Sequence, residues 1–135
     1  MCDSRRRSPA MIDYLREYDR LVEIGIGRRA DLAAALAKAD VAVTATDVYP
    51  RAVPDGVRFV RDDVVDPDPD VYADAEAVYA RNLPPELHRP TLEVAREADA
   101  TLYFTTLGGD QPAIPVERKT IREGTLYVAR AERRS

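Results

Sequence analysis

Short apolar runs alternate with amphipathic or alanine-rich runs along most of this chain. The apolar and β-branched runs predict five strands, over residues 20–24, 41–46, 57–60, 75–80 and 101–106. The spacing of apolar residues and the runs of alanine predict helices over residues 11–18, 28–38 and 90–99. Two further runs, 118–122 and 126–130, flank Glu123-Gly124 and predict a β-hairpin.

The order of these elements predicts the fold. Strands that alternate with helices form a mostly parallel sheet with helices on its faces, so we expect an α/β fold, a three-layer Rossmann-like sandwich. The C-terminal hairpin adds antiparallel strands to this sheet. The chain of 135 residues has room for one core, and we expect one domain over residues 11–131, between a disordered N-terminal tail at 1–10 and a short tail at 132–135.

Composition excludes several classes of protein. A hydrophobic content of 45% excludes wholesale disorder, and no apolar run approaches the ~20 residues that a membrane span needs. The N-terminus lacks the apolar core of a signal peptide, so we expect a cytoplasmic protein with no membrane partner. Cys2 is the only cysteine, which excludes an internal disulfide and a multi-cysteine zinc site.

Charge bears on the partners. The chain is acidic, with a net charge of −4, so we do not expect nucleic acid as a direct high-affinity partner. Arg5-Arg6-Arg7 is either a solvated tail or a contact for a polyanion. Aspartates crowd residues 62–70, which we expect to be loop, but their order lacks an EF-hand pattern and we expect no metal site.

Two glycines separate the first predicted strand from its helix. Gly25 and Gly27 permit positive φ and leave the backbone bare, so they form either a turn that a nucleotide-like ligand approaches or a tight turn that binds nothing. Glu23 precedes them, where it accepts hydrogen bonds from the turn or lies near the ammonium group of a ligand. Arg28 and Arg29 are either solvated or contact an anion.

Acidic residues follow the next two predicted strands. Asp47 lies about 20 residues beyond the glycines, at the position of a ribose-binding carboxylate. The alternative is that Asp47 caps a turn before Pro50. Asp63 either accepts a hydrogen bond from the exocyclic amine of adenine or belongs to a solvated acidic loop.

The segment after the fourth predicted strand is the candidate reaction centre. Asn82 can hydrogen-bond a nucleophile, Arg81 can bind a carboxylate or phosphate, and Glu86 can act as a base. The alternative is that the paired prolines at 84 and 85 start a helix, with Glu86 favourable near its N-terminus. His88 is the only histidine, and we expect it at the surface rather than acting as a general base.

All these segments are expected at one edge of the sheet, because the carboxyl ends of parallel strands lie together. Their pattern resembles that of the class I S-adenosylmethionine-dependent methyltransferases. The matching features are Glu23-x-Gly25-x-Gly27, Asp47, Asp63 and the polar, proline-bearing end of the fourth strand. More closely, from about Tyr14 to Ala131 the chain resembles a small archaeal family of uncharacterised Rossmann-like proteins. The stretches that carry this second resemblance are residues 22–27, 46–48 and 79–87.

The resemblance implies a methyltransferase-like fold and S-adenosylmethionine as the cofactor. Glu23, Gly25 and Gly27 would lie at its methionine moiety, Asp47 at the ribose and Asp63 at the adenine.

The sequence departs from the methyltransferases in two places. The glycine turn carries Arg29 where many of them have another glycine. Amino-directed methyltransferases read Asn/Asp-Pro-Pro-aromatic after the fourth strand, whereas here Leu83 intervenes and Glu86 replaces the aromatic residue.

Three functions follow as expectations. The first is a protein that binds S-adenosylmethionine or its demethylated product, as a minimal methyltransferase of unknown acceptor that Arg81, Asn82 and Glu86 orient or deprotonate. The second is a non-catalytic nucleotide-binding sensor or accessory subunit. The third is an NAD(P)-binding protein, against which Glu23 and Arg29 count. With little sequence for a lid, an active enzyme needs a protein partner, a second copy in a homodimer or an exposed substrate.

Overall fold

One sheet organises the chain, of which the computed structural model describes residues 8–131. Cys2, Arg5-Arg6-Arg7 and the expected C-terminal tail lie outside the described residues, as does the expected N-terminal tail up to residue 7. Near the start of the described part, the carbonyl oxygen of Pro9 accepts a hydrogen bond of 2.9 Å from the amide of Arg122.

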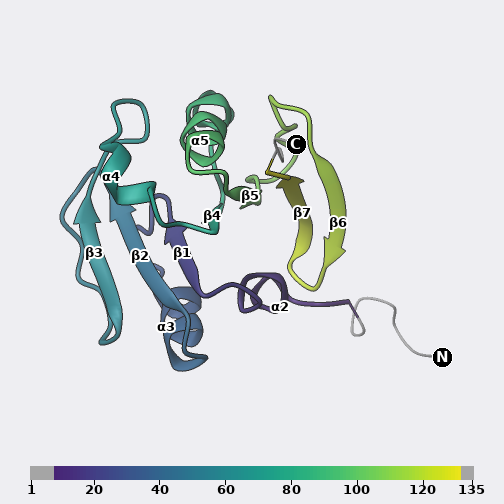
Figure 1. Cartoon of the computed structure of the whole chain (residues 1–135). Helices are drawn as coiled ribbons and strands as arrows, with labels where there is room; N and C mark the ends of the chain where they lie inside the picture. The colour runs from purple at the N-terminus through teal and green to yellow at the C-terminus, as the bar shows by residue number, and fades with distance from the viewer. Residues whose placement is uncertain (1–7, 132–135) are drawn as a thin grey trace.

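The seven strands lie within one or two residues of the runs predicted from the sequence. They are β1 Arg20–Glu23, β2 Ala42–Asp47, β3 Val57–Arg61, β4 Ala77–Ala80, β5 Thr101–Phe104, β6 Glu117–Ile121 and β7 Gly124–Ala129. Across the sheet their order is β3-β2-β1-β4-β5-β7-β6 (Figure 1). Neighbours from β3 to β5 are parallel, and β7 is antiparallel to both β5 and β6. This arrangement confirms the expected α/β fold with a mostly parallel sheet and a C-terminal antiparallel hairpin.

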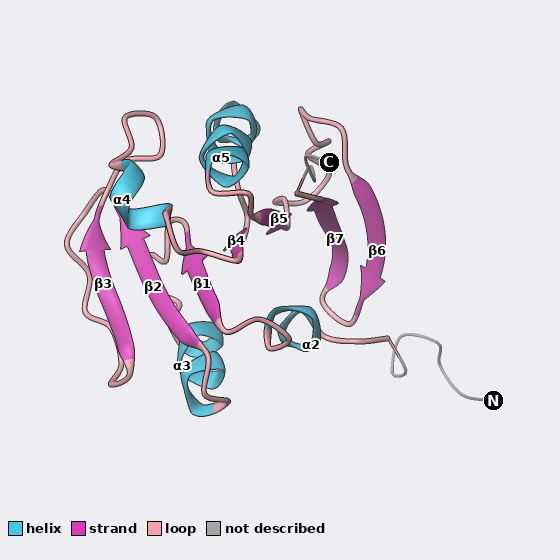
Figure 2. Ribbon diagram, viewed as in Figure 1, coloured by secondary structure: helices cyan, strands magenta, loops and turns pink. Residues whose placement is uncertain are grey.

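Side chains alternate between two hydrophobic cores, one on each face of the sheet. Along β4, Ala77 and Tyr79 belong to one core, whereas Val78 and Ala80 belong to the other. The helices that complete these cores are α2 Met11–Leu15 and α3 Asp31–Lys38 for the first, and α4 Pro69–Tyr72 and α5 Pro85–Glu97 for the second (Figure 2). The sheet is therefore the middle of three layers.

Two helices begin at residues that differ from those expected, and a third was not expected. α3 starts at Asp31 rather than at residue 28, because Gly27 has a φ of +57° and the amide of Arg29 turns back to Ile26. α4 lies inside the predicted acidic loop, where Asp68 accepts a hydrogen bond from the amide of Asp70 and caps the helix.

α5 starts at Pro85, as the alternative interpretation of the paired prolines held, and Pro90 lies inside the helix instead of starting its main body. Pro84 takes the extended conformation of an N-cap residue, and Pro85 occupies the first turn, where its missing N–H would have no partner in the helix. The β2–β3 and β5–β6 connections, residues 48–56 and 105–116, are fully described and hold no helix. None of the described helices is long and apolar enough to cross a membrane.

The order of the strands reverses between β1 and β4. β1 pairs with β2 on one side and with β4 on the other, so Glu23 lies between Ala45 and Tyr79. In open α/β sheets ligands bind beyond the carboxyl ends of the strands at such a point. The fold therefore directs attention to the residues that follow β1, β2 and β4.

Candidate functional site

The turn after β1 depends on its two glycines. Gly25 and Gly27 have φ values of +64° and +57°, in the left-handed region that other residues adopt at a cost. A Cβ built on Gly25 would meet no atom within 4 Å, and one on Gly27 would meet only the carbonyl oxygen of Gly25 at 4.0 Å. The turn therefore faces open space, and a ligand can approach its backbone.

Asp47, at the end of β2, is bonded to this turn. Its Oδ2 accepts a hydrogen bond of 2.8 Å from the amide of Gly27, and its Oδ1 accepts one of 3.0 Å from the amide of Tyr49. The residue is only 7% exposed. Asp47 therefore caps its own turn, as one expectation held, and also holds the glycine turn against the end of β2. Each carboxylate oxygen retains acceptor capacity for a further hydrogen bond.

Glu23 lies beneath the glycine turn and is 1% exposed. Its Oε1 accepts a hydrogen bond of 2.7 Å from the hydroxyl of Tyr79 on the neighbouring strand. Burial raises the pKa of Glu23 to about 7, although the Tyr79 hydrogen bond and the charge of Arg81 oppose the shift. The carboxyl group of Glu23 therefore changes charge near neutral pH, at the end of β1 just before the glycine turn.

Arg81 follows β4 and joins it to the start of α3. Its Nη2 donates to the carbonyl oxygen of Arg29 at 2.7 Å and to Oδ1 of Asp31 at 3.0 Å. The hydrogen bond from Arg81 lowers the pKa of Asp31. Because the Asp31 side chain is 71% exposed, this ion pair contributes little to stability. Its effect is geometric, since it holds the guanidinium beside the glycine turn.

Asn82, the next residue, has a strained backbone. Its φ is +53°, whereas the other described non-glycine residues with positive φ, Asp40 and Asp99, each follow the last turn of a helix. The amide of Asn82 donates a hydrogen bond of 2.9 Å to Oγ1 of Thr105, which helps to hold this conformation. Strain of this kind in a cleft is typical of functional sites.

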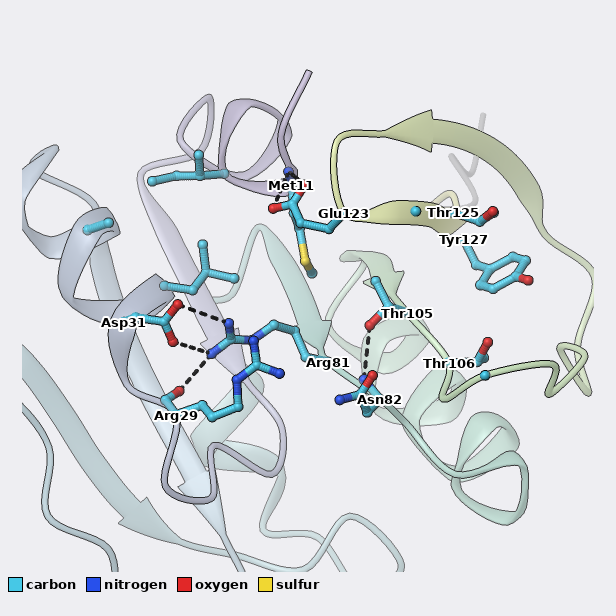
Figure 3. Close-up of a pocket in the computed structure, with 15 residues that line it drawn as sticks. Met11, Arg29, Asp31, Arg81, Asn82, Thr105, Thr106, Glu123, Thr125 and Tyr127 are labelled. Carbon is cyan, nitrogen blue, oxygen red and sulfur yellow. Dashed lines mark hydrogen bonds and ion pairs between the residues drawn. The ribbon is translucent and has the colours of Figure 1, made fainter. Parts of the chain in front are cut away.

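Arg81 and Asn82 line an open pocket of about 670 Å³ (Figure 3). Its walls come from the start of α3, from α2, from the ends of β4 and β5 and from the β6–β7 hairpin. The polar residues that Figure 3 labels around it are Arg29, Asp31, Arg81, Asn82, Thr105, Thr106, Glu123, Thr125 and Tyr127. Gly25, Gly27 and Asp47 do not line this pocket. The edge thus has two parts, the glycine turn with Asp47 and the pocket beyond β4 and β5.

Two of the expected site residues lie apart from both parts. Asp63 is exposed, and its Oδ1 accepts a hydrogen bond of 2.9 Å from the amide of Val65 within its own loop. Glu86 is exposed on the first turn of α5 and does not line the pocket. Among the described residues, no group of three or more His, Cys, Asp or Glu side chains is placed to hold a metal ion.

His88 is completely buried, so the expectation of a surface position was wrong. Its Nε2 lies 2.9 Å from the carbonyl oxygen of Leu83, and its Nδ1 accepts a hydrogen bond of 3.0 Å from the amide of Ala113. The main body of the helix was expected to start at Pro90, beyond His88, and the neighbouring residues are polar. The sequence therefore did not place His88 on the buried face of α5. His88 ties the turn after β4 to the β5–β6 connection.

Sequence reasoning also missed the pocket residues Asp31, Thr105 and Thr106 as parts of the site. Asp31 was concealed within the predicted helix, and the two threonines were assigned to the end of a strand. The two threonines follow the carboxyl end of β5. They could have been identified, as Asp47 was, from the rule that ligands bind beyond the carboxyl ends of parallel strands.

The fold is that of solved methyltransferases. The chain matches the MycE methyltransferase of the mycinamycin biosynthetic pathway, solved with Mg and SAH, with a TM-score of 0.57 and 11% identity. That match covers 88% of this chain but 44% of MycE, so the chain spans less than half of the MycE chain. A 1,6-didemethyltoxoflavin-N1-methyltransferase of Burkholderia thailandensis, solved with its substrate and S-adenosylhomocysteine, matches with a TM-score of 0.50 and 18% identity over 96% of this chain and 57% of the enzyme. At such identities the likeness shows the fold alone.

Relatives by sequence come from archaea. A UPF0146 protein of Halobacterium salinarum is 52% identical over 123 residues, which cover 90% of this chain and 95% of the relative. A UPF0146 protein of Archaeoglobus fulgidus is 41% identical over 100 residues, 73% of this chain and 77% of the relative. These relatives confirm the resemblance to a small archaeal family. The chain matches the uncharacterised protein family UPF0146 over residues 8–132, and it belongs to that family.

Proposed function

We propose that this protein binds S-adenosylmethionine or S-adenosylhomocysteine beyond the carboxyl ends of β1 and β2, as a minimal methyltransferase. The observation that carries the proposal is the hydrogen bond of 2.8 Å between the Gly27 amide and Asp47. It joins the bare turn after β1, which lies beside the point where the strand order reverses, to a carboxylate at the end of β2. Solved structures with this fold include a complex with S-adenosylhomocysteine, which supports the choice of ligand.

The residues present fit such a ligand. Gly25 faces open space that a side chain would fill, so the methionine moiety can lie against the turn. Asp47 keeps lone pairs that can accept hydrogen bonds from the ribose hydroxyls. Asp63 is exposed in the loop after β3, and it would accept a hydrogen bond from the exocyclic amine only if the adenine extends to that loop. Glu23 ends β1 just before this turn.

The acceptor would occupy the pocket beyond β4 and β5. When bound, the sulfonium supplies the reactive methyl group, so the protein needs mainly to orient the acceptor. Asn82 is held by strained backbone at the pocket wall, and its side-chain amide can hydrogen-bond the acceptor. Arg81, held by Asp31, contributes positive charge, and Glu86 takes up a proton only from an acceptor that extends out to α5.

Calorimetry with a matched pair of variants tests the ligand. Wild-type protein should bind S-adenosylhomocysteine and S-adenosylmethionine with a Kd on the order of micromolar, and NAD should not compete. Gly25→Ala should abolish this binding, because its methyl group fills the space at the turn. Gly56→Ala is the control, since Gly56 also has positive φ, at +87°, but lies before β3.

Equal affinity of the Gly25→Ala variant and wild type would exclude the glycine turn as the binding site. If folded wild-type protein bound neither S-adenosylmethionine nor S-adenosylhomocysteine, the proposed function would be overturned. Asn82→Ala should remove methyl transfer and leave cofactor affinity unchanged, and unchanged turnover would exclude Asn82 as a catalytic residue.

A non-catalytic nucleotide-binding subunit is the second candidate. The observation that favours it is the position of the exposed large apolar residues of the described chain, which all follow carboxyl ends of strands: Val48, Tyr49, Val65 and Leu107. Exposed apolar side chains around an open site suit contact with another protein. Cofactor binding without turnover toward any acceptor, and without effect of Asn82→Ala, would favour this candidate.

A further inference from the structure

Arg29 adds a second guanidinium to the wall of the pocket that Arg81 and Asn82 line (Figure 3). The two arginines are joined, because the Arg81 side chain donates to the carbonyl oxygen of Arg29. Arg81 is also bound to both carboxylate oxygens of Asp31. The guanidinium of Arg29, in contrast, forms no ion pair with any carboxylate in the part of the chain that the structure describes.

The acids near the two arginines do not balance their charge. The charges of Arg81 and Arg29 oppose the burial that raises the pKa of Glu23, and they add to the Arg81 hydrogen bond that lowers the pKa of Asp31. Asp31 is paired with Arg81, and Glu23, with a pKa of about 7, is only partly ionised at neutral pH. Glu123 lies on the hairpin, where both of its oxygens accept a backbone amide of α2. The Arg29 end of the pocket therefore matches a ligand group with a single negative charge.

Uncharged hydrogen-bond donors lie at the ends of β4 and β5, on the same pocket. Oγ1 of Thr105 accepts the amide of Asn82 at 2.9 Å, so the hydroxyl proton of Thr105 remains available to a ligand. Asn82 is exposed, and its side-chain amide carries two further N–H groups. A carboxylate accepts hydrogen bonds at both oxygens and donates none, so it suits these donors together with Arg29.

The pocket holds no group suited to take a proton from an acceptor. Among the described residues that line it, Asp31 and Glu123 are the only carboxylates, and both already accept hydrogen bonds. The hydrogen bond from Arg81 lowers the pKa of Asp31, which makes Asp31 a weaker base. Glu23 is 1% exposed, His88 is completely buried, and neither lines the pocket. An acceptor held inside the pocket is therefore expected to be a nucleophile with no proton to lose.

The charge at Arg29 distinguishes between the nucleophiles that meet this condition. Tertiary amines, thioethers and ring nitrogens gain a positive charge on methylation, which the neighbouring guanidinium groups would disfavour. A carboxylate is ionised at neutral pH and loses its charge on methylation. Transfer forms an O–CH3 bond and breaks the S–CH3 bond, whose electron pair stays on sulfur. The carboxylate and the sulfonium thereby become a neutral ester and a neutral thioether, and no proton is released.

We propose that the acceptor in this pocket is a carboxylate, which Arg29 binds together with Asn82 and Thr105, and that the product is its methyl ester. This inference rests on the proposed function and adds to it the chemical class of the acceptor and Arg29 as a specificity-determining residue. On α3, Leu32 and Ala35 continue the pocket wall with apolar side chains. The carboxylate is therefore expected on an apolar body such as a ring.

The test compares a carboxylate with its uncharged amide of similar shape. Benzoate and benzamide are titrated into protein saturated with S-adenosylhomocysteine, and NMR follows the backbone amide signals of Asn82, Thr105 and Thr106. Wild type should bind benzoate about tenfold or more tightly than benzamide, because hydrogen bonds to a charged group are stronger than those between neutral groups. Arg29→Met should bind the two probes with similar affinity.

Arg28→Met is the matched control, because Arg28 is exposed on the same turn but does not line the pocket. It should keep the preference of wild type for benzoate. Equal binding of the two probes by wild type, or an unchanged preference in Arg29→Met, would overturn the carboxylate assignment and leave the proposed function standing.

The affinity of Arg29→Met for S-adenosylhomocysteine separates the acceptor from the cofactor. The variant should keep the wild-type affinity. A loss of about tenfold or more would place Arg29 against the carboxylate of the cofactor and overturn its role toward the acceptor. Absence of S-adenosylhomocysteine binding by folded wild type would overturn both proposals.

Discussion

At the scale of single residues, Glu23 is the group in the site whose charge depends most directly on its surroundings. It is buried between β2 and β4, and burial outweighs both the Tyr79 hydrogen bond and the Arg81 charge, so its pKa rises to about 7. The bonds of Asp47, in contrast, come mainly from backbone amides. Two carboxylates at one edge of the sheet therefore serve different purposes, one as a hydrogen-bond acceptor and one as a buried acid.

The raised pKa predicts how stability depends on pH. The unfolded chain ionises Glu23 above about pH 4.5, whereas the folded protein keeps it protonated up to about pH 7. The unfolded state binds fewer protons in this window, so the free energy of unfolding should fall by about 3 kcal/mol between these pH values. Glu23→Gln removes the titration while keeping an oxygen for Tyr79. Urea unfolding of both proteins from pH 4 to 8 should show that the free energy of unfolding of Glu23→Gln increases relative to that of wild type as pH rises.

Two tyrosine variants control this prediction. Tyr79→Phe removes a hydrogen bond that lowers the pKa of Glu23, so the fall in stability should extend to higher pH. Tyr72→Phe removes a similar hydrogen bond to Asp62 and should leave the window unchanged. Parallel pH profiles of wild type and Glu23→Gln would contradict the assignment.

At the scale of elements, α5 joins two segments that also carry pocket residues, the turn after β4 and the β5–β6 connection. Its first turn carries His88, which bonds both the turn after β4 and the β5–β6 connection. The ring also packs against Phe104 at 4.6 Å between centroids. Because Nδ1 accepts a backbone N–H, the ring is neutral and carries its proton on Nε2. The β5–β6 connection, which carries Thr105 and Thr106, is therefore anchored to α5.

Removal of this connection should loosen the loop. His88→Leu leaves the Ala113 amide and the Leu83 carbonyl without partners, and should lower the free energy of unfolding by about 2–3 kcal/mol. Hydrogen exchange of the Ala113 amide should accelerate. Arg89→Leu, an exposed neighbour on the same helix, should change stability by less than about 0.5 kcal/mol. Unchanged exchange at Ala113 in His88→Leu would contradict the role of His88.

The same element shows what sequence can and cannot predict. Strands such as β2 were predicted to within one or two residues, because apolar runs and β propensity are local properties. The start of α5 was misplaced because Pro84 and Pro90 both carry start signals and only packing selects between them. The ion pair of Arg81 with Asp31 joins residues 50 positions apart, and the hydrogen bond of Ala113 with His88 joins residues 25 positions apart. No local pattern encodes either contact.

At the scale of the whole molecule, a methyltransferase-like sheet is surrounded, in the described part of the chain, by short helices and loops. The β2–β3 and β5–β6 connections are loops, and α2 and α4 are short, with 5 and 4 residues. The candidate site consequently lies open along one edge, with no described segment over it that resembles a lid. A ligand bound there would contact loops that follow several strands at once, so its effect should extend through most of the domain.

This architecture predicts a large effect of the ligand on stability. A ligand that binds only the folded state at 100 times its Kd adds about 2.7 kcal/mol to the free energy of unfolding. For a domain of this size that corresponds to a rise in Tm of about 10 °C. S-adenosylhomocysteine should produce this rise in wild type and Gly56→Ala but not in Gly25→Ala, and hydrogen exchange should slow first around Gly25, Asp47 and Asn82. A rise in Tm with protection elsewhere would place the ligand outside the edge of β1, β2 and β4.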